Sequence, residues 1–113
     1  MAQSELLDDD AQLRAYRCLL ENARAMLKAA REQRWDDLTS LDAERQTCLQ
    51  RVVEQDLIST RPGCVEDKAG LIQGILECDE QTRVLTRAWQ DEMLQVLDSL
   101  GNERKLADAY GGA

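Results

Sequence analysis

The sequence predicts an all-α fold, an antiparallel helical bundle of three main helices and a short C-terminal helix. Hydrophobic residues make up 43% of the 113 positions, with one proline and six glycines to interrupt them. Leu and Ala dominate the apolar set, and Glu, Gln and Arg lose little side-chain freedom in helices. Apolar residues recur every three or four positions, which is the helical period. A chain of this length fits one domain over residues 1–113.

The first helix is predicted over about residues 10–32. Asp8, Asp9 and Asp10 suit its start, where negative charge meets the positive end of the helix dipole, and Lys28 and Arg31 suit its end. Its apolar residues alternate spacings of three and four and therefore share one face, which consists of Leu13, Tyr16, Leu20, Ala23, Leu27 and Ala30.

The second helix is predicted over about residues 36–59, after a tight turn near Trp35. Asp36 is expected to accept a hydrogen bond from the unpaired amides at the start of this helix. Pro62 and Gly63 cannot continue a helix and set its latest end. Arg45 interrupts the apolar face, so the helix is amphipathic without being strongly apolar.

The third helix is predicted over about residues 65–100 and carries the longest periodic run. Gly101 is expected to cap it, because a left-handed C-terminal cap favours a residue without Cβ. A short tail helix is then expected over about residues 102–110. The periodic run consists of Leu71, Ile75, Cys78, Thr82, Leu85, Trp89, Met93, Val96 and Leu100.

The sequence carries no recognisable catalytic, cofactor or metal site. Histidine is absent, so the histidine ligands of a bundle metal centre are missing. No glycine-rich phosphate loop is present, and clustered carboxylates on a helix usually form a solvated face. No Cys-x-x-Cys pair occurs, and the four cysteines are interpreted as structural: Cys18, Cys48, Cys64 and Cys78. We expect a binding protein without enzymatic activity.

The formal net charge of −8 opposes direct binding to nucleic acids or anionic membranes. The N-terminus lacks the basic and apolar segments of a secretory signal. No window approaches the roughly 20 apolar residues that cross a bilayer. We therefore expect a cytoplasmic protein.

The third helix has more apolar residues than a short hairpin can cover, so a partner or a second copy is expected to bind it. A wider core that includes the tail helix is the alternative. Each candidate residue suits that core at least as well, and Trp89 suits it better, because a large aromatic side chain in a helical stripe normally fills a gap between helices. Leu106 and Tyr110 on the tail are predicted to form a detachable cover for the third helix. The candidate partner-binding residues are Ile72, Ile75, Leu76, Leu85, Trp89 and Met93.

Three stretches resemble the FliT family of flagellar type III export chaperones. They are Trp35-Asp36-Asp37-Leu38 at the turn, Ile75-Leu76-Glu77-Cys78-Asp79-Glu80-Gln81 in the third helix, and the ending Arg104-Lys105-Leu106-Ala107-Asp108-Ala109-Tyr110-Gly111. The chain departs from the family at the turn, where Gln33-Arg34-Trp35 replaces the frequent Gly-Glu-Trp.

This resemblance implies a chaperone that keeps the filament-cap protein soluble before export and docks at the export ATPase complex and the export gate. A homodimer is expected for the free protein. The alternative is a structural subunit of a permanent coiled-coil assembly, which has no client to release.

Overall fold

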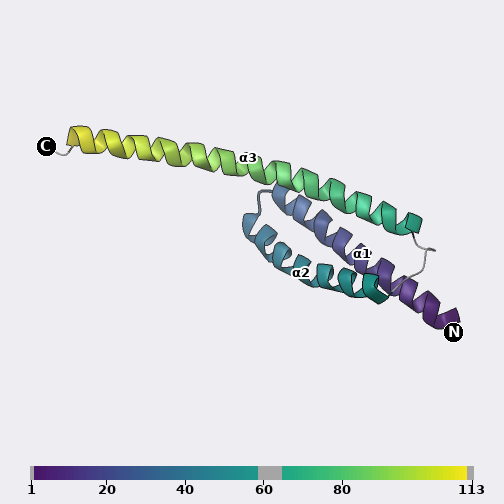
Figure 1. The fold of residues 1–113 in the computed structure, drawn as a ribbon. Helices are drawn as coiled ribbons and strands as arrows, with labels where there is room; N and C mark the ends of the chain where they lie inside the picture. Colours follow the sequence, from purple (N-terminus) through teal and green to yellow (C-terminus); the bar gives the residue numbers. More distant parts are fainter. Residues whose placement is uncertain (1, 59–64, 112–113) are drawn as a thin grey trace. The chain divides into compact units, whose positions relative to one another are not determined.

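The computed structural model describes the backbone of residues 2–58 and 65–111 and the side chains of residues 11–56 and 66–110. All regular structure in these segments is helical (Figure 1). The all-α prediction is therefore confirmed. The helices are α1 (Ala2–Arg31), α2 (Trp35–Ile58) and α3 (Val65–Gly111).

The chain divides into two compact units, Met1–Thr82 and Arg83–Ala113. Unit 1 contains α1, α2 and the first part of α3. Unit 2 contains the rest of α3. The single domain expected from the chain length stays a prediction.

In unit 1, α1 and α2 form an antiparallel hairpin and lie side by side (Figure 1). A helix cap with two backbone hydrogen bonds ends α1: the amide of Arg34 donates to the carbonyl of Ala29 (2.8 Å), and that of Gln33 donates to Ala30 (3.2 Å). Gln33 takes the left-handed conformation that this cap requires, with φ at 58°. The turn is thus closed by the backbone itself.

The core of unit 1 is built mainly by α1, whose apolar face meets residues from both other helices. Gly74 of α3 allows a close approach to α1, because a Cβ there would lie 3.1 Å from Cδ1 of Leu20. Cys18, Leu49, Leu71, Ile72 and Cys78 pack partly buried around the cluster. The buried cluster consists of Ala15, Tyr16, Leu19, Leu20, Ala23, Cys48, Val52 and Ile75.

Two helix boundaries differ from the sequence-based expectation. The helix α1 begins at Ala2 rather than near Asp10, because the residues before Asp10 include good helix formers and no breaker. The acidic run therefore lies inside α1. The helix α2 begins at Trp35, so Asp36 lies in its first turn rather than before it. The carbonyl of Arg34 accepts the amide of Leu38 at 3.0 Å.

The predicted break at Gly101 is wrong, and the separate tail helix is not observed. The helix α3 continues through Gly101 to Gly111. No glycine in the described segments has a positive φ. One glycine in a helix interior costs about 1 kcal/mol, whereas ending the helix would leave several carbonyls without intrahelical partners. The good helix formers after Gly101 favour continuation.

Candidate functional site

Unit 2 carries a row of accessible apolar side chains on α3. Trp89, Met93, Val96 and Leu100 are separated by four, three and four residues and therefore share one face of the helix. Trp89 is half-buried, while Met93, Val96 and Leu100 are 38%, 48% and 55% exposed. We call these four residues the α3 stripe.

The α3 stripe continues the helical register of residues that build the core of unit 1. Ile75 is 6% exposed in that core, and Leu71 and Cys78 pack against it. The same spacing of three and four residues leads from these positions to Trp89. A single amphipathic pattern thus supplies a core in unit 1 and accessible apolar side chains in unit 2.

The candidate residues in unit 1 have different environments. Ile75 belongs to the buried core, and Ile72 is half-buried against it. For Ile75 the structure supports the core alternative. Leu76 is 60% exposed and remains accessible to a partner.

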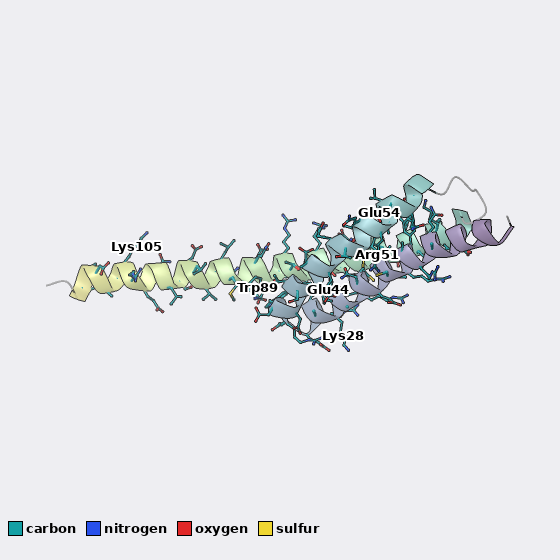
Figure 2. The ribbon with its side chains drawn as sticks, turned by 90° about the horizontal axis from the view of Figure 1, so that it is seen from below. Lys28, Glu44, Arg51, Glu54, Trp89 and Lys105 are labelled. Carbon is teal, nitrogen blue, oxygen red and sulfur yellow. The ribbon has the colours of Figure 1, made fainter. Side chains whose placement is uncertain are left out.

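None of the candidate residues in unit 2 is fully buried. Leu85 and Trp89 are half-buried, and Met93 is exposed. Trp89 is labelled on α3 in Figure 2. Sequence reasoning did not select Val96 and Leu100 as candidates, although both were in the predicted periodic run. Their register with Met93 was the signal that could have identified them.

The tail residues Leu106 and Tyr110 are 57% and 84% exposed. Both lie on the same continuous helix as Met93 and Leu97. Because α3 has no break at Gly101, the expected joint for a cover that folds back is absent from this structure.

A bidentate ion pair joins α2 to the part of α3 in unit 1. The guanidinium of Arg45 donates to both carboxylate oxygens of Asp79, at 2.7 and 2.6 Å. The hydrogen bond to Asp79 raises the pKa of Arg45 against the opposing effect of burial. Arg45 interrupts the apolar face of α2 because its charge has a partner on α3. This pairing ties α2 to α3.

Asp56 connects all three helices in unit 1. Gln12 and Lys68 donate to its Oδ1 at 2.8 and 3.0 Å, and the hydroxyl of Tyr16 donates to Oδ2 at 2.6 Å. The Nζ atom of Lys68 also lies 5.2 Å from the centre of the Tyr16 ring. Burial raises the pKa of Asp56, but these hydrogen bonds and the charge of Lys68 outweigh it and lower that pKa. We call these four residues the Asp56 cluster.

Two cysteines that are far apart in sequence are brought together between α1 and α2. The Sγ atoms of Cys18 and Cys48 are 2.9 Å apart. Burial, more than the neighbouring thiol, raises the pKa of Cys48 to about 11. Cys78 is a free thiol, and Cys64 lies outside the described residues. Cys18 and Cys48 are each 15 positions from Gln33 at the turn, but equal spacing alone does not specify the rotation of α1 and α2 that brings the two thiols into contact.

Among the described residues, no group of three or more potential ligand side chains could hold a metal ion. None of the described helices combines the length and apolar character needed to cross a bilayer.

The chain was compared with known protein families, curated proteins and solved structures. The model of the family described as flagellar protein FliT matches residues 13–112. A curated relative, flagellar protein FliT of Photorhabdus laumondii subsp. laumondii, is 23% identical over 100 residues, which cover 88% of this chain and 80% of the relative. No solved structure matches the chain.

Proposed function

The chain belongs to the FliT family of flagellar proteins, and from this membership we propose that it is an export chaperone for the flagellar filament-cap protein. The observation that carries the proposal is the family match over residues 13–112, which includes both units. The chaperone would keep an apolar segment of its client covered in the cytoplasm until export.

The α3 stripe is the surface that we assign to the client. An apolar client helix could lie along it, because anchors separated by three and four residues match those of an amphipathic helix. Trp89 and Met93 would provide most of the binding energy, since large side chains dominate such contacts. Exposed Leu97 flanks the stripe and would extend the contact.

Delivery to the export apparatus completes the proposed function. Docking at the export ATPase complex and at the export gate would require partners other than the client. Leu76, which is exposed on unit 1, offers an apolar contact outside the α3 stripe. We propose that such partners contact unit 1 while the client remains on unit 2.

The client proposal is tested by calorimetry with the filament-cap protein from the same organism. Leu100→Asp places a charge in the α3 stripe and is expected to weaken binding at least about tenfold. Leu94→Asp is the matched control, because Leu94 is similarly exposed on the same helix but lies off the stripe. Its affinity should remain within about threefold of the wild type. Equal losses in the two variants would contradict the assigned surface.

The length of α3 also favours self-association, because its 47 residues carry accessible apolar side chains. We propose that the free protein forms a weak homodimer through the α3 stripe and that the client replaces the second copy. Sedimentation velocity over a range of protein concentrations distinguishes this weak homodimer from a permanent coiled-coil assembly. A chaperone should dissociate on dilution and form a one-to-one complex with client, whereas a permanent assembly should keep one stoichiometry.

A further inference from the structure

Cys18 and Cys48 are placed for a covalent bond that the sequence pattern does not indicate. Their Sγ atoms are 2.9 Å apart, whereas bonded sulfurs are about 2.05 Å apart. Cys18 lies on α1 and Cys48 lies on α2, so the bond would join the two helices of the hairpin. The sulfurs need to approach by less than about 1 Å, which small side-chain rotations can provide.

Cys18 is also accessible from outside the core. It is half-buried and lines an open groove of about 270 Å³ between α1 and α2. Arg14 and Arg51 line the same groove, and Arg51 is labelled on α2 in Figure 2. The guanidinium of Arg51 suits a small reagent that carries a carboxylate. Cys48 is buried, so the reagent meets Cys18 first.

We propose that Cys18 and Cys48 form a reversible intramolecular disulfide by exchange with an anionic low-molecular-weight disulfide. The Cys18 thiolate attacks one sulfur of the reagent and forms a mixed disulfide, and one reagent thiolate leaves. Cys48 then loses its proton to water and attacks the Cys18 sulfur, and the second reagent thiol leaves. The two cysteines lose two electrons and two protons, and the reagent is reduced to two thiols.

The disulfide would lock α1 against α2. It would close a loop between positions that are 30 residues apart, which restricts the unfolded chain. Burial raises the pKa of Cys48 to about 11, so the second step depends on the proximity of the two sulfurs rather than on a ready supply of thiolate. In a reducing compartment such a bond would be transient and responsive to oxidation.

The test treats the full-length protein with oxidised glutathione and measures its intact mass and thermal midpoint. The wild type should lose two hydrogen atoms without retaining glutathione, and a peptide map should join the Cys18 and Cys48 peptides. The thermal midpoint should rise by about 10 °C and return after reduction with dithiothreitol. A second variant, Cys64→Ser/Cys78→Ser, should behave in the same way, because it keeps both paired thiols.

Further single replacements in the Cys64→Ser/Cys78→Ser variant separate the formation of the mixed disulfide from the attack by Cys48. Adding Cys48→Ser should leave a stable glutathione adduct on Cys18, whereas adding Cys18→Ser should prevent both the adduct and the crosslink. The proposal is overturned if the wild type stays fully reduced, if glutathione remains on both Cys18 and Cys48, or if the map joins another pair. A crosslink that lowers the thermal midpoint would also overturn the proposed lock.

Discussion

At the scale of single residues, Gln33 holds a conformation that favours glycine. Its φ of 58° lies in the left-handed region, and its amide is part of the cap that ends α1. The FliT resemblance associates this turn with a frequent glycine, and the structure gives the physical reason. A side chain with Cβ costs about 1 kcal/mol in this conformation.

Replacing Gln33 with Gly should therefore stabilise unit 1 by about 0.5–1 kcal/mol. Urea unfolding followed by circular dichroism measures the change. Gln46→Gly is the matched control, because Gln46 is exposed inside α2, where glycine should cost about 1 kcal/mol. If both variants lose stability equally, the cap does not have this geometry in solution.

The Asp56 cluster predicts a contribution to stability that depends on pH. Tyr16→Phe removes the hydroxyl that donates to Asp56 at 2.6 Å and should cost about 1 kcal/mol near neutral pH. Tyr110→Phe is the control, because Tyr110 is 84% exposed and should change nothing measurable. Equal stabilities for the two variants at neutral pH would show that the Tyr16 hydrogen bond contributes nothing.

The direction of the pH effect follows from the lowered pKa of Asp56. A carboxyl with a lower pKa in the folded state stabilises the protein above its unfolded pKa of about 4, and this contribution is lost as the pH falls through the folded value. The difference between wild type and Tyr16→Phe should therefore shrink below about pH 4. Urea unfolding at a series of pH values measures it, and a difference that grows on acidification would contradict the assignment.

At the scale of elements, the uninterrupted α3 changes the interpretation of the tail. Gly101 is exposed, and a Cβ added there would meet nothing within 4 Å. Gly101→Ala should stabilise the helix locally by about 1 kcal/mol, which slows amide exchange over residues 102–110 about fivefold. Exchange measured by mass spectrometry tests this expectation. A tail that works as a hinged cover would instead show unchanged exchange and altered partner affinity in this variant.

The ion pair between Arg45 and Asp79 also acts between elements. It ties α2 to α3 through two short hydrogen bonds, and the Arg45 side chain is 17% exposed. The net contribution of such an ion pair to the free energy of unfolding is small. The pair still constrains the rotation of α3 within unit 1, because a planar guanidinium can donate two hydrogen bonds to a carboxylate in only a few orientations.

At the scale of the whole molecule, the division into two units predicts that the core is independent of the α3 stripe. Among residues with described burial, Thr82 is the last buried position, and the core cluster ends at Ile75. A chain that ends at Thr82 should keep a cooperative thermal transition within about 5 °C of the full-length midpoint. It should lose client binding, because the stripe is removed. Loss of the transition would show that unit 1 needs unit 2 to fold.

The sequence by itself determined the helical class and the resemblance to FliT. The family match confirms that resemblance. These features are local, because helix formation depends on neighbouring side chains and on hydrogen bonds four residues apart. The periodic run through Trp89 and Met93 likewise indicated an apolar face on the third helix.

The tertiary structure decided how that face is used. Ile75 and Met93 belong to one pattern, yet Ile75 is buried and Met93 is exposed. The tertiary structure also decided the contact between Cys18 and Cys48, because this contact depends on the register and rotation of α1 against α2. Contacts between helices join residues that are distant in sequence, so periodicity along one helix does not specify which residue lies opposite on another.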